Sequence, residues 1–355
     1  MDLKQIISQF NKFTLENKYR AVERSNLLSP YFEGEFNLSG AHGYLIPAIR
    51  SKKKVKKDAI SVVDLCIRKV DGEIIGISPY HLLLFEMGVF GEFGHILNRE
   101  EVQQKQFSLL FDFLEEIGIA KEKLIITVSG GVGYAGKYFN EDTQTIKILQ
   151  LLGVNRNKII TTSGRRNFML SRGIDRLAGY NVEFFIKKKS GYLEIASSNI
   201  YQYLNKITHL EKTVNMGVGC GFGLDRLSYA LSNKNNIYDI EPFHSMFKEL
   251  IPMFNSSISL DLIKYKVARI IELSKSLVFI INDGIDFNNT PQGKTMKRYL
   301  AKLTSEMKFL ELDTGGFIKI FKNGICNYYN DRYKIKTSSY DYLESKIDEI
   351  LIKIK

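Results

Sequence analysis

The sequence predicts an α+β fold, in which an antiparallel sheet flanked by helices is followed by a mainly helical region with one small hairpin. Between about residues 60 and 223, β-branched and apolar runs are broken by occasional stretches of helical spacing, instead of alternating regularly with them. After about Pro242 the apolar residues change to helical spacing. The length of 355 residues favours a large domain and a smaller one, which we place at residues 1–240 and 241–355.

The expected elements of the first region begin with two strands. The run at residues 60–69, ISVVDLCIRK, is β-branched and mostly apolar, which is typical of a buried strand. The run at 82–90, LLLFEMGVF, is a second strand candidate, and the short loop between the two suggests an antiparallel pair. The remaining expected elements are a helix at 99–117, a strand at 124–128, a helix at 143–152, and strands at 158–162, 182–186, 192–195 and 199–203.

The second region is expected to be helical apart from one hairpin. Asn323-Gly324 supplies the positive φ angles of a type I′ turn, so the flanking runs 318–322 and 325–329 predict two short paired strands. The expected helices are 263–281, which stops at the C-cap pattern Asn282-Asp283-Gly284, then 292–310, and a last helix that starts near Ser338 with Asp341 as its capping-box partner.

Composition limits the class of protein. With 44% hydrophobic and 25% charged residues the chain can bury a core, which excludes wholesale disorder. The net charge of +11 favours anionic partners such as nucleotide, RNA or acidic lipid, without choosing among them. Three distant cysteines argue against a disulfide framework and for a reducing cytoplasm. No apolar run reaches the roughly 20 residues that span a bilayer, and we therefore expect a soluble cytoplasmic protein without a membrane segment.

The segment from Gly131 to Tyr138 resembles two phosphate-binding patterns. It satisfies GxGxxG and nearly satisfies the P-loop pattern around Lys137. A dinucleotide site would need an acidic residue at the end of the next strand, and a P-loop would need Ser or Thr where Tyr138 stands. The favoured interpretation is a surface turn, with a P-loop nucleotide hydrolase as the remaining alternative.

Four glycines alternate with other residues from Gly217 to Gly223, just before a predicted helix. On a strand they would share one face and leave it bare, which suits a flat group such as a purine. Arg226 in the first turn of that helix is then placed to bind a phosphate. The equally weighted alternative is close backbone packing, with Arg226 in an ion pair to Asp225 or Glu194.

The segment Gly221-Phe-Gly223-Leu-Asp225-Arg226-Leu resembles motif 3 of the class II aminoacyl-tRNA synthetases, in the form carried by alanyl-tRNA synthetases. Other segments of the chain are similar to that family in the same order, across about residues 5–300. They are Cys66-Ile67-Arg68, His81 through Met87, Phe93-Gly94, residues 124–128, Asn167-Phe168, Glu183, Leu193-Glu194-Ile195 with Gln202-Tyr203, and residues 279–289.

The resemblance implies an ATP- and Mg²⁺-dependent enzyme that joins a carboxylate to AMP and releases pyrophosphate. Arg68 would then hold the α-phosphate and the substrate carboxylate, and Arg226 the distal phosphate. Glu86 would bind adenine or Mg²⁺, and Glu194 is a second candidate for Mg²⁺. The implied ATP site is Arg68, His81, Glu86, Gly221, Gly223 and Arg226. The alternative for Arg68 is a buried, paired arginine in the strand that carries Asp64.

Three departures from the family concern the substrate pocket. Gly219 stands where alanyl-tRNA synthetases carry an Asp that binds the amino group of alanine, and Ala196-Ser197 replaces their Trp-Asn pair. The stretch before Glu183, a further pocket candidate, also differs from the family pattern. The resemblance therefore implies that the ATP half of the site is kept, and that the acid is one other than L-alanine, either larger or without a conventional α-amino group.

The RNA-binding parts of the family are matched only partly. Asn289 stands at a family position that contacts a base, and Lys294, Arg298 and Lys302 form a basic stripe that suits an RNA backbone or, equally, a solvated helix face. The basic run 52–57 is expected to be an exposed loop. The chain resembles a truncated family member, without the zinc-bearing editing domain or the oligomerising C-terminal domain. The histidines show no zinc-ligand spacing, and a homodimer is suggested only by analogy.

The leading hypothesis is a stand-alone enzyme that activates a carboxylic or amino acid and passes it to tRNA, a carrier protein or a small amine. One alternative is a minimal alanyl-tRNA ligase that charges tRNA. A second alternative, from a different class, is a catalytically silent synthetase paralogue that binds or regulates a partner. The presence of Arg68, Glu86 and Arg226 together argues against the silent paralogue, because a silent copy has no need for buried charges.

Overall fold

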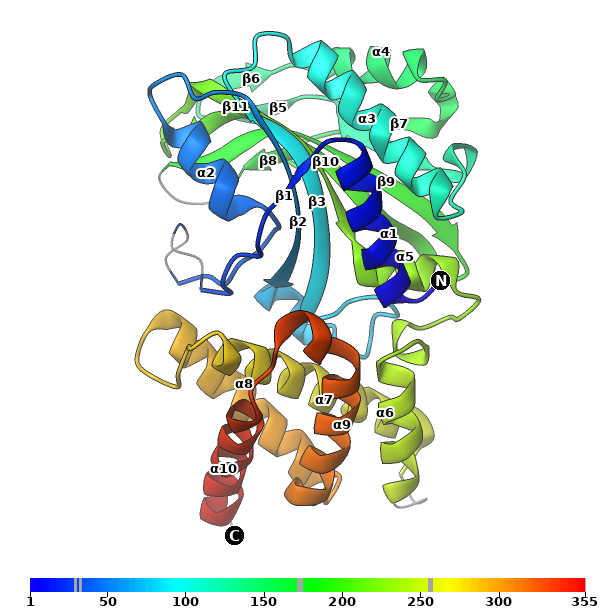
Figure 1. Cartoon of the computed structure of the whole chain (residues 1–355), viewed down its shortest axis with the longest axis vertical. Coiled ribbons are helices and arrows are strands. Elements are labelled where there is room, and N and C mark those ends of the chain that lie inside the picture. Colours follow the sequence, from blue (N-terminus) through cyan, green and yellow to red (C-terminus); the bar gives the residue numbers. More distant parts are fainter. Residues whose placement is uncertain (29–30, 32–33, 171–174, 255–257, 355) are drawn as a thin grey trace. The chain divides into compact units, whose positions relative to one another are not determined.

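A computed structural model describes residues 1–28, 31, 34–170, 175–254 and 258–354 (Figure 1). The chain divides into two compact units. The first unit comprises Met1–Ser25, Ser39–Asp64 and Glu86–Asn233, and the second comprises Asn26–Leu38, Leu65–Phe85 and Lys234–Lys355. No helix among the described residues is long and apolar enough to cross a membrane.

The first unit is built on one mixed sheet, which confirms the predicted α+β class. Its strand order is β1-β2-β3-β11-β10-β9-β4-β7, and β8 pairs with β9. The pairs β3–β11, β11–β10, β10–β9 and β9–β4 are antiparallel, whereas β1–β2 and β4–β7 are parallel. The strands are β1 (Arg20–Ala21), β2 (Asp58–Ile67), β3 (Leu84–Gly94), β4 (Ile125–Ser129), β7 (Ile159–Thr162), β8 (Phe168–Leu170), β9 (Arg176–Lys188), β10 (Gly191–Asn205) and β11 (Leu210–Gly223).

The helices α1 (Leu3–Glu16) and α3 (Arg99–Glu116) cover one face of this sheet (Figure 1). Aromatic side chains fill the contact between them and the sheet. Phe10 of α1 lies over the sheet, with its ring 6.1 Å from that of Phe222 on β11. Phe113 of α3 packs edge-on against the same Phe222, at 5.1 Å. Because side chains alternate along a strand, this face of β11 is apolar and its other face is left for the glycines. The helices of the first unit are α1 (Leu3–Glu16), α2 (His42–Arg50), α3 (Arg99–Glu116), α4 (Thr143–Leu151) and α5 (Leu224–Leu231).

Most of the predicted elements of the first unit are confirmed, and one pair is corrected. The runs at 192–195 and 199–203 are parts of a single strand, β10 (Gly191–Asn205). Its register with β9 shifts between Glu194 and Ala196, and again between Tyr201 and Tyr203. These irregularities interrupt the alternation of apolar and polar residues, which is why the sequence suggests two short strands.

The C-terminal part of the second unit consists of helices and their connections, with no strand among its described residues, and the predicted hairpin is wrong. Residues 318–329 lie inside the helix α9. Phe317, Phe321 and Ile325 recur at intervals of four and are buried on one face of that helix. The helices of this unit are α6 (Phe243–Leu250), α7 (Leu260–Asn282), α8 (Pro291–Phe309), α9 (Thr314–Tyr333) and α10 (Thr337–Ile354).

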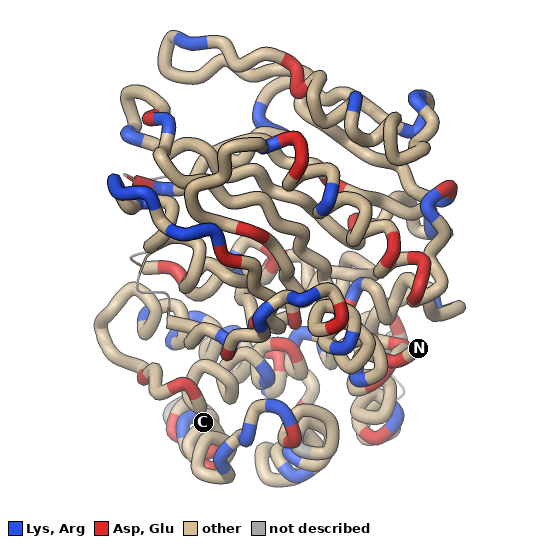
Figure 2. Tube along the Cα trace, turned by 45° about the horizontal axis from the view of Figure 1, so that its top comes forward, with Lys and Arg blue, Asp and Glu red and all other residues tan. Residues whose placement is uncertain are grey.

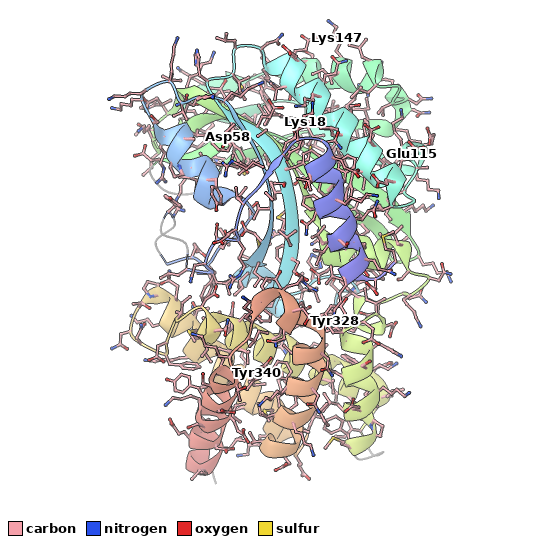
Figure 3. All side chains as sticks on the ribbon, in the orientation of Figure 1. Lys18, Asp58, Glu115, Lys147, Tyr328 and Tyr340 are labelled. Carbon is pink, nitrogen blue, oxygen red and sulfur yellow. The ribbon has the colours of Figure 1, made fainter. Side chains whose placement is uncertain are left out.

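The glycine of the expected Asn-Gly turn has a packing role instead. A Cβ at Gly324 would lie 2.7 Å from Cγ of Met246 on α6, so glycine lets the two helices approach. On the neighbouring helix, Tyr340 (labelled in Figure 3) contacts Phe321, with ring centroids 6.1 Å apart. The last helix begins at Thr337, one residue before the predicted start.

A buried carboxylate of α7, Glu272, forms an ion pair within that helix and also binds a loop of the second unit. Glu272 and Lys275 are both fully buried, and Oε1 of Glu272 lies 2.5 Å from Nζ of Lys275. The other carboxylate oxygen accepts hydrogen bonds from the backbone N–H groups of Leu83 (2.8 Å) and Leu84 (3.4 Å). The charge of Glu272 is thus satisfied from two directions, and it fixes the chain just after His81.

Candidate active site

The alternating glycines lie on β11 and share one face of the sheet, as predicted. The residues between them, Val218, Cys220 and Phe222, are buried on the opposite face. One glycine is nevertheless covered, because a Cβ at Gly217 would lie 3.2 Å from Cδ1 of Ile49 on α2. The expectation of a bare surface is therefore wrong at Gly217. We call Gly219, Gly221 and Gly223 the glycine strip.

The glycines of the strip have different neighbours. A Cβ at Gly219 would lie 3.2 Å from the carbonyl oxygen of Phe90, and one at Gly91 would lie 2.7 Å from Cα of Gly219. Close backbone packing therefore accounts for Gly219. In contrast, Gly221 faces the flexible end of Met87 at 3.1 Å, and Gly223 faces the side chain of Arg226 at 3.4 Å. Only the end of the strip near Arg226 is lined by side chains that can move aside.

Arg226 lies in the first turn of α5 and is paired within the first unit. Its Nη1 lies 3.2 Å from Oε2 of Glu194 and 3.4 Å from the backbone oxygen of the same residue. Its side chain is 19% exposed. Of the two ion pairs that the sequence allows, the structure shows the one to Glu194. Oδ2 of Asp225 instead accepts a 2.7 Å hydrogen bond from the backbone N–H of Glu86.

Glu86 does not face the glycine strip. Met87 pairs with Gly223 and Val89 with Gly221, so these two residues of β3 lie on the strip side. Glu86 alternates with them and is 1% exposed on the opposite side of the sheet. The prediction that Glu86 binds adenine or Mg²⁺ at the strip is therefore corrected, and Glu194 is the carboxylate found there.

Ser197 and Glu183 continue the strip face across the sheet, whereas Ala196 does not. Ser197 pairs with Gly221 on one side and with Glu183 on the other. Ala196 pairs with Phe222 and Phe184 and is 2% exposed, which places it on the core face. Of the predicted pocket residues, the structure thus aligns Ser197, Glu183 and Gly219 on the strip face and assigns Ala196 to the core.

Glu183 is a half-buried carboxylate with neutral hydrogen-bond donors. Thr127 Oγ1 donates to its Oε2 at 3.3 Å, and Asn181 Nδ2 donates to its Oε1 at 3.2 Å. Burial raises the pKa of Glu183 above its ordinary value, and the nearby charge of Glu194 raises it further. Sequence reasoning missed Thr127 and Asn181. The alternation Asn181-Val182-Glu183 gave a signal, since it places the two polar side chains on one face.

Arg68 and His81 belong to the second unit and are described there. Arg68 follows β2 directly. Its side chain is 44% exposed, and its Nε lies 3.6 Å from Oδ2 of Asp71. The argument that this arginine must be used or paired because it is buried therefore does not hold. His81 Nδ1 lies 2.6 Å from Oγ of Ser78, and its ring lies against that of Tyr80, at 4.6 Å between centroids.

The predicted RNA-contacting residues lie on or beside α8. Lys297 Nζ donates to Oδ1 of Asn289 at 3.1 Å, and Arg298 Nη2 donates to Oγ1 of Thr295 at 3.1 Å. Lys302 forms an ion pair with Glu73, and Lys294 is exposed. Figure 2 shows basic residues interspersed with acidic ones along the chain trace. Several of these cations are thus already engaged within the second unit.

Three further expectations concern loops and metal ligands. The lysines of residues 52–57 lie in an exposed loop, as predicted. The GxGxxG segment forms a hairpin of β5 (Val132–Tyr134) and β6 (Lys137–Phe139), with positive φ at Ala135 and Gly136. Lys137 begins strand β6, whereas in a P-loop a helix begins at the corresponding lysine, so the surface-turn interpretation holds. In the described parts of the chain, no three His, Cys, Asp or Glu side chains form a metal-binding group.

The structure describes the side chains of two of the three cysteines. Cys66 and Cys220 are buried, and neither forms a disulfide bond with another described cysteine. Burial raises the pKa of the Cys220 thiol to about 12, so this thiol stays protonated at neutral pH. The side chain of Cys326 lies outside the described residues.

Comparison with known proteins matches most of the chain to the family that its sequence motifs resemble. The family model "tRNA synthetases class II (A)" matches residues 44–350. The chain is 26% identical to the alanine–tRNA ligase of Ruthia magnifica subsp. Calyptogena magnifica, over 85% of this chain and 36% of that protein. It is 23% identical to that of Borrelia hermsii, over 88% of this chain and 54% of that protein. The chain thus spans about a third to a half of the length of these curated relatives.

Among solved structures, a crystal structure of histidyl-tRNA synthetase from S. aureus is similar, with a TM-score of 0.43 and 14% identity. That match covers 67% of this chain and 68% of the other.

Proposed function

The chain belongs to the class II aminoacyl-tRNA synthetases and resembles their alanyl members, and from this premise we propose that it activates a carboxylic or amino acid with ATP. The carboxylate of the acid attacks the α-phosphorus of ATP, an acyl-adenylate forms, and pyrophosphate leaves. The observation that carries the proposal is the glycine strip ending at Arg226, because it offers a flat surface beside a cation in the first turn of a helix.

The ion pair between Arg226 and Glu194 holds a cation that can bind a phosphate beside a carboxylate that can bind Mg²⁺. We propose that bound ATP takes Glu194's place as the partner of Arg226. The Glu194 carboxylate would then be free to hold Mg²⁺, which prefers carboxylate and phosphate oxygens. When bound, Mg²⁺ would neutralise part of the negative charge of the phosphates. Arg226 stabilises the negative charge that accumulates as pyrophosphate leaves.

The roles of Arg68 and His81 follow from the family resemblance. Arg68 would hold the α-phosphate and the substrate carboxylate, and His81 would lie near the phosphates. Exposure of the Arg68 side chain and its long contact to Asp71 leave the guanidinium able to exchange partners. We also propose that residues 1–240 act as the catalytic domain and that 241–355 correspond to the helical domain.

The acid is proposed to differ from L-alanine, because Gly219 provides no carboxylate and Ser197 provides little bulk on the strip face. The acceptor is proposed to be tRNA, a carrier protein or a small amine, and a homodimer is suggested by family analogy. A minimal alanyl-tRNA ligase is the alternative that the similarity to alanine–tRNA ligases favours.

A silent paralogue is also favoured by one observation. Arg226 is already neutralised by Glu194, and Arg68 is not buried, so neither arginine requires a ligand. Pyrophosphate exchange with a panel of amino and non-amino acids, with and without bulk tRNA, separates the three hypotheses. Acid-dependent exchange supports activation, L-alanine as the best substrate supports the alanyl-tRNA ligase, and no exchange together with unaltered ATP binding in Arg226→Ala supports the silent paralogue.

A further inference from the structure

One loop of the second unit carries both of that unit's proposed phosphate ligands. Arg68 stands at the start of this loop, and His81 stands near its end. The backbone N–H of Arg68 donates a 3.2 Å hydrogen bond to the carbonyl oxygen of Leu83, which joins the two ends of the loop. The positions of both side chains therefore depend on where the chain is held at Leu83.

Glu272 of α7 holds the end of that loop. Its Oε2 accepts hydrogen bonds from the backbone N–H groups of Leu83 (2.8 Å) and Leu84 (3.4 Å), where β3 begins. The carboxylate is fully buried together with its partner Lys275. A buried ion pair often stabilises a fold no more than apolar side chains of similar volume do. What the carboxylate adds is an acceptor for two consecutive N–H groups, which an apolar residue could not supply.

Tyr238 holds the same loop at His81 itself. Its hydroxyl donates a 3.3 Å hydrogen bond to the backbone oxygen of His81. The ring is buried against those of Phe243 and Phe247, with centroids 5.2 and 5.6 Å away. Burial, and then the charge of Glu272, raise the pKa of Tyr238 well above its ordinary 10, so the hydroxyl keeps its proton and can donate it.

Two further contacts fix the course of the loop. The backbone N–H of Ile237 donates to the carbonyl oxygen of Pro79 at 2.8 Å. Gly76 has a φ of +76°, and a Cβ there would lie 3.0 Å from the backbone oxygen of Tyr265 on α7, so the loop lies directly against that helix. A loop held at several points is preorganised, and preorganised groups bind and react with less loss of freedom.

We propose that Glu272 and Tyr238 are positioning residues of the proposed acid activation. They hold the backbone on the two sides of His81, and through Leu83 they also hold that of Arg68, so that both side chains are presented to the phosphates of ATP. Neither Glu272 nor Tyr238 touches ATP itself. This inference rests on the proposed function, and it gives the C-terminal helical region a part in the reaction.

Two double variants isolate the acceptor at position 272. Glu272→Gln with Lys275→Met keeps a carbonyl oxygen for the two N–H groups, whereas Glu272→Met with Lys275→Met removes it. Both variants lose the ion pair, so they match in charge. In pyrophosphate exchange, the variant that keeps the oxygen is expected to stay within about threefold of wild type in kcat/KM for ATP, and the other to lose about tenfold or more.

A second comparison tests whether Tyr238 acts through His81. Tyr238→Phe removes one hydroxyl and is expected to lower kcat/KM for ATP about fivefold. In a protein that already carries His81→Ala, the same change should cost less than about twofold, because residues that act through one another are not additive. Tyr180→Phe, which removes a 3.0 Å hydrogen bond to the backbone oxygen of Asn140 in the first unit, is the matched control and should leave kcat/KM unchanged.

The outcomes separate this inference from the proposed function. Equal kcat/KM in the two double variants, or an equal effect of Tyr238→Phe with and without His81, overturns the positioning role while acid activation stands. If a double variant fails to melt cooperatively, the comparison at Tyr238 decides alone.

Absence of exchange with every acid in the wild-type protein overturns the proposed function, and the same variants are then compared by calorimetric titration with ATP and Mg²⁺. An ATP affinity that falls in the same order supports the positioning role. Equal affinities, or no binding of ATP by the wild-type protein, overturn it.

Discussion

Arg226 Nη1 lies 3.2 Å from Oε2 of Glu194, and this contact joins the start of α5 to β10 at the open end of the glycine strip. A cation and an anion are therefore held side by side next to Gly221 and Gly223, which carry no side chains of their own. The pair is only partly exposed, at 19% and 34% of the two side chains. A triphosphate that binds there must compete with Glu194 for the guanidinium. The strength of this ion pair therefore affects the affinity for nucleotide.

Replacing Arg226 separates its ligand role from its structural role. In Arg226→Ala the dissociation constant for ATP is expected to rise about 10–100-fold, since hydrogen bonds to charged groups contribute roughly 1.5–3 kcal/mol. The free energy of unfolding is expected to change by less than about 1 kcal/mol, because partly exposed ion pairs stabilise weakly. Calorimetric titration with ATP and Mg²⁺ measures the dissociation constant, and urea denaturation measures the free energy of unfolding. Arg20→Ala, which removes the exposed ion pair with Asp58, is the control; equal ATP affinity in both variants would contradict the assignment.

Alanine substitutions at two glycines distinguish folding from ligand access. Gly91→Ala is expected to destabilise the protein strongly, because its Cβ would lie 2.7 Å from Cα of Gly219 and 2.9 Å from the carbonyl oxygen of Val218, neither of which can move aside. Gly221→Ala should fold normally, since the nearest atom to its Cβ would be the flexible end of Met87 at 3.1 Å. It is nevertheless expected to weaken ATP binding by adding bulk to the strip. Thermal melting and ATP titration of the two variants test this, and normal ATP affinity in Gly221→Ala would remove the strip from the site.

The buried pair of Glu272 and Lys275 is expected to be strongly coupled. Glu272→Ala should lower the free energy of unfolding by about 3–5 kcal/mol, because it leaves a buried ammonium ion without its carboxylate. The double variant Glu272→Met with Lys275→Met should lose much less, since no buried charge remains. Urea denaturation measures both. Glu73→Ala, which breaks the exposed ion pair with Lys302, is the control and should change stability by less than about 1 kcal/mol. If the double variant were as unstable as Glu272→Ala, the unpaired buried charge would not be the cause of the lost stability.

The raised pKa of Glu183 predicts a pH dependence of stability with a definite sign. In the folded protein, burial and then the charge of Glu194 raise the pKa of this carboxyl above its ordinary 4.5. The folded state therefore binds more protons than the unfolded state in the window just above pH 4.5, and stability falls as pH rises through that window. Glu183→Gln removes this contribution. The difference in unfolding free energy between wild type and Glu183→Gln, measured by denaturation from pH 4 to pH 8, should grow in favour of the variant as pH rises; a difference independent of pH would contradict the shift.

Much of the fold followed from the spacing of apolar residues. The bounds of the helices α3, α4, α7 and α8 and of the strands β2, β3 and β4 lie within four residues of the predicted ones, because each element has a single continuous apolar pattern. The hairpin at Asn323-Gly324 failed because a local turn signal was preferred to the four-residue period of Phe317, Phe321 and Ile325. Contact with Met246, which the sequence does not reveal, explains that glycine.

The outline of the site was predictable from the sequence, but the predicted positions of some of its side chains were wrong. Motif similarity located Arg226 and Glu194, but similarity does not say which face of a strand a residue occupies. Alternation along β3 would have placed Glu86 with Leu84 on the core face. The place of Ala196 was harder, because the irregularity between Glu194 and Ala196 breaks the alternation along β10. Thr127 became part of the site only through the pairing of β4 with β9, which joins segments far apart in the sequence.

The most direct test is exchange of radiolabelled pyrophosphate into ATP by the purified full chain, across amino acids and their uncharged analogues. We predict exchange that requires an added acid and falls by at least about tenfold in Arg226→Ala. A folded protein that shows no acid-dependent turnover, or one whose turnover does not change in Arg226→Ala, would contradict the account.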